Sequence, residues 1–136
     1  WWGQSSDMPN ALRSADIFCL PTFYREGTPK ALLEAAASGL PIVTSNIPGC
    51  RDVVRNGENG VLVSPRKINE LEAALEKLIL DRQFRQRASV KSRQLAEEEF
   101  CVKSFIRQTI KLYTNVTAKR LGPDPSLDET QIVRIS

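Results

Sequence analysis

The sequence predicts an α/β protein built on part of a doubly wound parallel sheet and followed by C-terminal helices. Short apolar runs at 17–20, 41–44 and 61–63 each stop at proline or polar residues, as strands buried in a parallel sheet do. A segment of helical character separates the first two runs, and strand–helix–strand units assemble into parallel sheets. From residue 68 onward, apolar residues recur at helical spacing.

Helix boundary signals flank the first strand. Asp7 is suited to the N-cap of a short helix that reaches residue 15. After the strand, Thr28 suits the N-cap of a second helix, Pro29 its first position and Gly39 the position just past its end. These signals predict a helix between Pro29 and Gly39.

The second and third strands are predicted to be joined by a loop. Residues 46–50 form a tight connection, the alternative being that they line a ligand pocket, and the Asn and Gly residues of 56–60 tolerate the positive φ of turns. Three helices follow, at 68–79, at 81–99 and around 105–113.

The composition excludes several classes of protein. Of 136 residues, 41% are hydrophobic and 26% charged, which disfavours disorder, and no apolar run is long enough to span a bilayer. Nineteen Lys and Arg against sixteen Asp and Glu leave a net charge of +3, and their interleaving is unlike a nucleic-acid-binding stripe. Histidine is absent, so a Ser-His-Asp triad and an ordinary zinc site are excluded within this chain.

The cysteines and the first residues favour a cytoplasmic protein. Cys19, Cys50 and Cys101 lie far apart without a CxxC pair, so they are expected to be reduced thiols, with Cys19 buried in a strand. No basic segment followed by an apolar one opens the sequence, so nothing resembles a secretory signal.

The segment 24–34 carries the candidate site. It follows the carboxyl end of a parallel strand and leads into a helix N-terminus, where open α/β sheets bind ligands and where unpaired N–H groups suit a phosphate. Gly27 lets a ligand approach the backbone, and Thr28 and Lys30 keep N–H donors, whereas Pro29 has none. The expected ligand is an anion, most simply a pyrophosphate.

Two carboxylates, Glu26 and Glu34, flank this anion site. Glu34 lies among apolar helix residues, where vicinal hydroxyls of a ligand could satisfy it by donating two hydrogen bonds. An exposed ion pair between Lys30 and Glu34, four residues apart, is an equally good account. A glycosidase pair is disfavoured, because eight helical residues span about 12 Å, more than the roughly 5–9.5 Å that hydrolysis needs.

Several motifs follow one another along most of the chain. They are ADIFCLP at 15–21, the Glu-x7-Glu spacing at 26–34, EAAASGLPIVT at 34–44, PGCRDVV at 48–54 and NGENGVLV at 56–63. In this order they resemble the retaining glycosyltransferases of family four, which have the GT-B fold, and imply its Rossmann-like C-terminal domain. The variants at 24–27 and 48–51 are similar to those of bacterial enzymes of exopolysaccharide and lipopolysaccharide synthesis.

The resemblance implies a role for each matched residue. Glu34 would hydrogen-bond the ribose of a nucleotide-diphosphate-sugar donor. Glu26, the catalytic position, would contact hydroxyls of the transferred sugar and position it rather than attack it. The amides of Gly27, Thr28 and Lys30 would meet the diphosphate or that sugar. No metal or other cofactor is expected, because helix dipoles and basic side chains can stabilise the departing diphosphate.

The resemblance also implies that the chain is part of a larger enzyme. Residues 1–120 would be the C-terminal part of the donor domain and 121–136 a flexible tail. The family's donor-phosphate Arg and Lys and its acceptor-binding half would precede Trp1, so the chain alone is expected to be inactive. The acceptor, a sugar or lipid-linked sugar, would bind that absent half. The basic cluster 82–93 is expected to be a solvated helix face, the alternative being contact with the inner face of an anionic membrane.

Two other functions remain open. The chain could be a non-catalytic nucleotide-sugar-binding module, or a structural α/β interaction domain in which Glu26 and Glu34 are surface residues. Nucleotide binding separates the structural domain from the other two, and sugar transfer separates the enzyme from the binding module.

Overall fold

The computed structural model describes residues 7–24 and 27–121, with side chains described as far as residue 116. The chain divides into two compact units, Trp1–Glu97 and Glu98–Ser136. The first unit holds the sheet and the second holds α6 (Val102–Leu121). The tail predicted for 121–136 lies, except for its first residue, outside the described residues.

Three parallel strands form one sheet in the order β1, β2, β3, which confirms the predicted parallel arrangement. They are β1 (Phe18–Leu20), β2 (Ile42–Ser45) and β3 (Gly60–Val63). Ile42 of β2 pairs with Phe18 on one side and with Gly60 on the other. Because the strands are parallel, their carboxyl ends share one edge of the sheet, where the loops to the helices begin.

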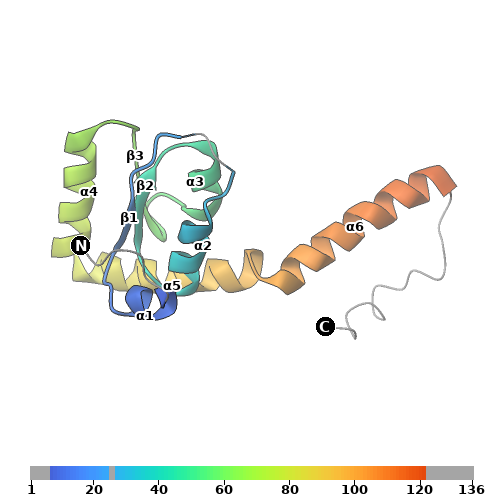
Figure 1. The fold of residues 1–136 in the computed structure, drawn as a ribbon, viewed down its shortest axis with the longest axis horizontal. Coiled ribbons are helices and arrows are strands. Elements are labelled where there is room, and N and C mark those ends of the chain that lie inside the picture. The colour runs from blue at the N-terminus through green and yellow to red at the C-terminus, as the bar shows by residue number, and fades with distance from the viewer. Residues whose placement is uncertain (1–6, 25–26, 122–136) are drawn as a thin grey trace. The chain divides into compact units, whose positions relative to one another are not determined.

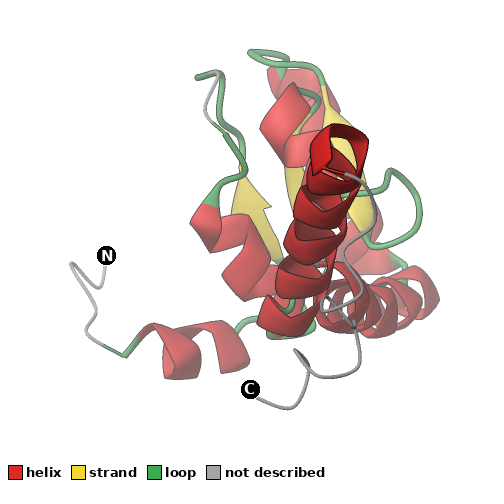
Figure 2. Ribbon diagram, turned by 90° about the vertical axis from the view of Figure 1, so that its right-hand side faces the viewer, coloured by secondary structure: helices red, strands yellow, loops and turns green. Residues whose placement is uncertain are grey.

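Helices cover both faces of the sheet (Figure 1). On one face α2 (Lys30–Ala37) packs beside α3 (Pro48–Val53), and on the other α4 (Ile68–Leu80) packs against β2 and β3. Figure 2 shows the strands of the sheet in yellow, viewed from the side on which α2 and α3 lie. This two-sided cover is the one predicted for a doubly wound sheet.

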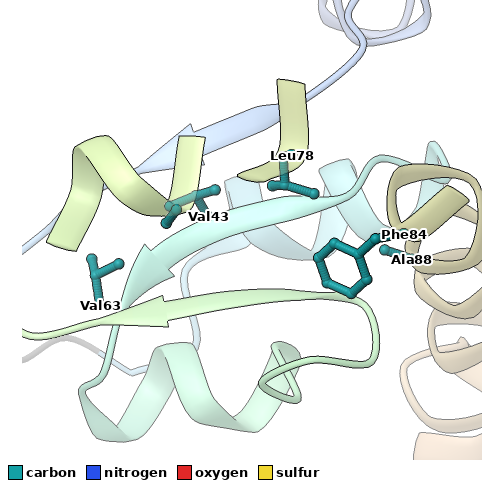
Figure 3. Close-up of a cluster of buried hydrophobic side chains, with 6 residues drawn as sticks. Val43, Val63, Leu78, Phe84 and Ala88 are labelled. Carbon is teal, nitrogen blue, oxygen red and sulfur yellow. The ribbon is translucent and has the colours of Figure 1, made fainter. Parts of the chain in front are cut away.

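Buried apolar side chains join α5 (Arg82–Glu99) to the sheet and to α4 (Figure 3). Val43 and Val63 come from adjacent strands, Leu78 from α4, and Phe84 and Ala88 from α5. The aromatic ring of Phe84 is only 4% exposed. The sheet and α5 therefore share one core, although most of the α5 surface is polar.

Two helices begin at the aspartates that precede them. The side chain of Asp7 accepts a hydrogen bond from the N–H of Asn10 at 3.2 Å and caps α1 (Met8–Arg13), as the sequence predicts. Asp81 accepts a hydrogen bond from the N–H of Phe84 at 2.8 Å, in the first turn of α5. Each carboxylate satisfies an N–H that has no partner within its helix.

The start of α2 differs by one residue from the prediction. Pro29 has an extended backbone, with φ −65° and ψ 124°, so it is the N-cap, and Thr28 does not cap the helix. The other end agrees: Gly39 adopts a φ of 71°, and its N–H bonds to the carbonyl of Ala36 at 2.9 Å. This left-handed ending is the one that glycine favours.

The tight loop predicted at 46–50 is wrong, because α3 begins inside it. Ile47 is extended and Pro48 occupies the first turn of the helix. The residues that α3 buries are Gly49, Cys50 and Val53. A six-residue helix is too short to show apolar periodicity, and its stability comes from packing against α2.

Cys19 is exposed, which corrects the prediction that it is buried in its strand. β1 is the end strand of the described sheet, so it is packed less completely than β2, whose residues are all buried. The thiol is nevertheless partly surrounded by protein, and this burial raises the pKa of Cys19 above its ordinary value.

Candidate functional site

The candidate site, residues 27–30 with Glu34, lies where the chain passes from β1 into α2. The strand ends at Leu20, whose carbonyl accepts a hydrogen bond from Oγ1 of buried Thr44 at 2.8 Å. This bond fixes the point at which the chain leaves the sheet. Glu26 lies outside the described residues, so its predicted role stays a prediction.

The backbone at the start of α2 is open to solvent. Gly27, Thr28 and Lys30 are all exposed. A Cβ added at Gly27 would meet nothing within 4 Å, so a ligand has room to approach this backbone. The N–H of Leu32 bonds to the carbonyl of Pro29 at 3.0 Å, whereas the amides at the very start of a helix have no acceptor within it. This geometry suits an anion.

Lys30 and Glu34 form the ion pair that their spacing predicts. Nζ of Lys30 lies 3.3 Å from Oε1 of Glu34, and the two side chains are 88% and 39% exposed. An ion pair this open to water is weak, so a ligand could displace it. Both residues lie within the first turns of α2, close to the exposed backbone of Gly27 and Thr28.

Apolar burial fixes α2 beneath these exposed groups. Leu32, Ala35 and Ala36 are fully buried. They place the core-facing side of α2 against the sheet and against α3. The helix start is therefore held by the fold, while its polar groups remain accessible.

A hollow of about 180 Å³ lies at the same edge of the sheet, where all three strands end. The residues that line it are Pro21, Phe23, Ser45, Val63, Ser64, Arg66, Lys67, Ile68 and Leu71. Phe23, Arg66 and Lys67 belong to none of the sequence motifs described above. The signal that could have found the two basic residues is their position directly after the third strand.

The turn between β3 and α4 is held by hydrogen bonds. Oε2 of Glu70 accepts the N–H of Ser64 at 2.7 Å, and the carbonyl of Ser64 accepts the N–H of Lys67 at 3.2 Å. The hydrogen bond from Ser64 lowers the pKa of Glu70 below its ordinary value, because it favours the charged carboxylate.

Aromatic and cationic side chains connect this turn to the loop after β1. The guanidinium of Arg66 lies 4.7 Å from the ring centroid of Phe23. The ring of Phe23 stacks on that of Tyr24, with centroids 4.3 Å apart and an interplanar angle of 29°. These contacts link the loop after β1 to the turn after β3 at the carboxyl edge of the sheet.

The sequence profile of the family described as "Glycosyl transferases group 1" matches residues 1–95. The chain belongs to this family. Its structural neighbours have the GT-B fold, so the resemblance to glycosyltransferases and the predicted fold class are both confirmed.

Relatives of this group 1 chain include enzymes with named activities. Glycogen synthase of Mycobacterium tuberculosis is 35% identical over 116 residues, which cover 85% of this chain and 28% of that protein. The Escherichia coli UDP-Gal:alpha-D-GlcNAc-diphosphoundecaprenol alpha-1,3-galactosyltransferase is 38% identical over 77 residues, 57% of this chain and 19% of that protein. The chain thus spans less than a third of the length of either relative.

The fold of this group 1 chain is also similar to that of solved structures. The Anabaena protein Alr3699/HepE, solved in complex with UDP, superposes with a TM-score of 0.76 at 22% identity. The match covers 82% of this chain and 30% of that structure.

A larger hollow of the group 1 chain, about 660 Å³, lies at the other end of α2. Its wall includes Ser89 and Arg93 of α5, which donate hydrogen bonds to the carbonyls of Gly39 at 2.6 Å and Ala37 at 2.5 Å. These bonds satisfy the carbonyl end of α2. The hollow is therefore separate from the candidate site and is built around a helix ending.

The basic cluster 82–93 is more than a solvated face. Arg85 donates hydrogen bonds to the carbonyls of Leu78 at 2.6 Å and Ile79 at 2.8 Å, at the end of α4. Arg93 does the same for α2. The predicted solvated face is an incomplete account of these two arginines, because each also satisfies a helix C-terminus.

Among the described residues, no helix combines the length and the apolar character needed to cross a membrane. Within the same ranges there is no group of three or more His, Cys, Asp or Glu side chains placed to hold a metal ion.

Proposed function

We propose that this chain is part of the donor-binding domain of a retaining glycosyltransferase of family four that uses a nucleotide-diphosphate sugar. The observation that carries the proposal is the exposed backbone from Gly27 to Lys30, with Glu34 in the following turn. It lies at the carboxyl edge of a parallel sheet, where such sheets bind nucleotides. A relative named for UDP-Gal and a structural neighbour solved with UDP support the same ligand class.

Different residues of the candidate site bind different parts of the donor. The amides of Gly27, Thr28 and Lys30 bind the diphosphate or the sugar next to it, helped by the positive end of α2. When the donor binds, the ion pair between Glu34 and Lys30 breaks, and the carboxylate of Glu34 accepts hydrogen bonds from the ribose hydroxyls. Glu26, from its place one residue before Gly27, contacts hydroxyls of the transferred sugar and positions it.

The leaving diphosphate gains negative charge as the glycosidic bond to it breaks. Amides fixed at a helix start stabilise that charge without having to reorient, so this chain needs no metal for the step. The departing diphosphate would stay on the attacked face of the sugar, which gives retention of configuration. The relatives named as glycosyl-transferring enzymes favour an enzyme over a non-catalytic binding module or a structural interaction domain.

The wider role of the protein follows from its relatives. Those named for lipid-linked sugars and for capsular polysaccharide favour bacterial polysaccharide or lipopolysaccharide synthesis, with hexosyl transfer to a sugar or lipid-linked acceptor. The matched part is less than a third of two such relatives, so this chain alone should not turn over substrate. A cytoplasmic enzyme that meets lipid-linked acceptors would touch the inner membrane face, and Arg82 and Arg87 are exposed for it.

Titration of the full-length protein with UDP tests the donor site. Glu34→Ala should weaken UDP binding about ten- to hundredfold, because hydrogen bonds to a charged group contribute about 1.5–3 kcal/mol. Glu97→Ala is the matched control, since Glu97 forms an exposed ion pair of the same spacing with Arg93, at 2.6 Å, away from the site. Absence of binding to UDP and to other nucleoside diphosphates would support the structural domain, and binding without sugar transfer would support the binding module.

A further inference from the structure

Two loops at the carboxyl edge of the sheet contact one another. Residues 21–24 leave β1 and lead towards Gly27, and residues 64–67 leave β3 and lead into α4. They meet where the guanidinium of Arg66 lies over the ring of Phe23, at 4.7 Å from its centroid. Both residues line the hollow of about 180 Å³ between the strand ends.

Arg66 holds a strained backbone conformation to make this contact. Its φ is 63°, and no other non-glycine residue in the described ranges has a positive φ. Glycine adopts this conformation readily, whereas a residue with a Cβ is strained by it. If residue 66 served only to join β3 to α4, glycine at this position would give a turn at least as stable. The strained backbone therefore indicates that the side chain of Arg66 has a role of its own.

Hydrogen bonds hold the turn that carries the side chain of Arg66. Glu70 in the first turn of α4 accepts the N–H of Ser64, and the carbonyl of Ser64 accepts the N–H of Lys67. Phe23 is 47% exposed, and its ring also stacks on Tyr24. The loop after β1 is thus steadied from the side of β3 by Arg66.

We propose that Arg66 is a positioning residue for the donor site. By holding Phe23, it fixes residues 21–24 and so sets where the chain arrives at Gly27, without contacting the donor itself. The inference rests on the proposed function, in which the amides at Gly27 bind the diphosphate.

Substitution of Arg66 in the full-length protein separates positioning from stability. Arg66→Gly removes the contact and relieves the strain, so the melting temperature should stay unchanged or rise while the Kd for UDP rises about two- to fivefold. Arg66→Lys should restore most of the affinity, because an ammonium group can also lie over the ring. An unchanged Kd in Arg66→Gly overturns the proposal.

A second variant and two controls test whether the contact itself is responsible. Phe23→Leu should raise the Kd as Arg66→Gly does, and the double variant should be no worse than either. Lys77→Met should leave the Kd unchanged, since Lys77 makes the same kind of contact with Phe84, also at 4.7 Å, between α4 and α5. Lys67→Gln removes the charge of a second basic residue that lines the hollow. A Kd increase equal to that of Arg66→Gly would mean that charge acts instead and would overturn the proposal.

Hydrogen exchange measured without UDP tests the effect of Arg66 on the loop after β1 independently of donor binding. The amides of Thr22 and Tyr24, which donate hydrogen bonds to the carbonyl of Leu20 and to Oγ1 of Thr22, should exchange faster in Arg66→Gly than in the wild type, and those of α5 should not. If the wild-type protein binds neither UDP nor another nucleoside diphosphate such as GDP or ADP, the proposed function fails, and the exchange rates still decide whether Arg66 fixes the loop. Equal exchange in the two proteins overturns that part as well.

Discussion

At the scale of single residues, the two glycines that flank α2 should respond in opposite ways to alanine. Gly27→Ala should leave stability unchanged, because a Cβ there meets nothing within 4 Å. The added methyl group would occupy the space that a phosphate needs, so UDP binding by the full-length protein should weaken about tenfold, a loss of about 1.5 kcal/mol. Calorimetric titration measures this loss.

Gly39→Ala is the matched control for that prediction. Gly39 has a φ of 71° and ends α2, so alanine should cost about 1 kcal/mol of unfolding free energy. Its UDP affinity should not change, because Gly39 lies at the far end of the helix. Normal UDP binding by Gly27→Ala would show that no ligand group approaches this backbone.

Glu70 gives the protein an acid-sensitive contribution to stability. Its pKa in the folded state lies below the ordinary value of 4.5, chiefly because its carboxylate accepts the N–H of Ser64. A lowered carboxyl pKa stabilises the fold at pH values above 4.5, and this contribution is lost as the pH falls below it. Melting temperatures of Glu70→Gln should therefore fall less steeply with acid than those of the wild type. Glu72→Gln, on the same helix, should follow the wild type.

At the scale of elements, local signals predict most of the fold and the residues of the candidate site, but not the contact between the loops that follow β1 and β3. Gly39 marks the end of α2 correctly, and the apolar runs locate all three strands. The helix α3 has no comparable signal, because packing on α2 creates it rather than periodicity. The Lys30–Glu34 pair follows from helical spacing, whereas the contact of Arg66 with Phe23 joins residues far apart in sequence and depends on how the strands are ordered.

Asn59 connects α3 to β3 and shows how a turn residue becomes a core residue. It is fully buried; its Oδ1 accepts the N–H of Arg55 at 2.8 Å, and its Nδ2 donates to the carbonyl of Val53 at 3.1 Å. Asn59→Ala leaves both groups without this partner and should lower the unfolding free energy by about 1–3 kcal/mol. Chemical denaturation measures the change. Asn46→Ala, at an exposed position, should cost much less, and equal losses would contradict the structural role of Asn59.

At the scale of the whole molecule, the two compact units should respond separately to damage in one core. Phe84 joins α5 to the sheet inside the first unit, and replacing a buried phenylalanine by alanine costs about 3–5 kcal/mol. In Phe84→Ala, amides of β2 and α4 should therefore exchange much faster, while those of α6 in the second unit keep their wild-type rates. Phe105→Ala, on α6 and 68% exposed, should leave exchange in the sheet unchanged. If Phe84→Ala accelerated exchange in α6 as strongly as in β2, the two units would unfold as one, and a donor site in the first unit would depend on the second for its stability.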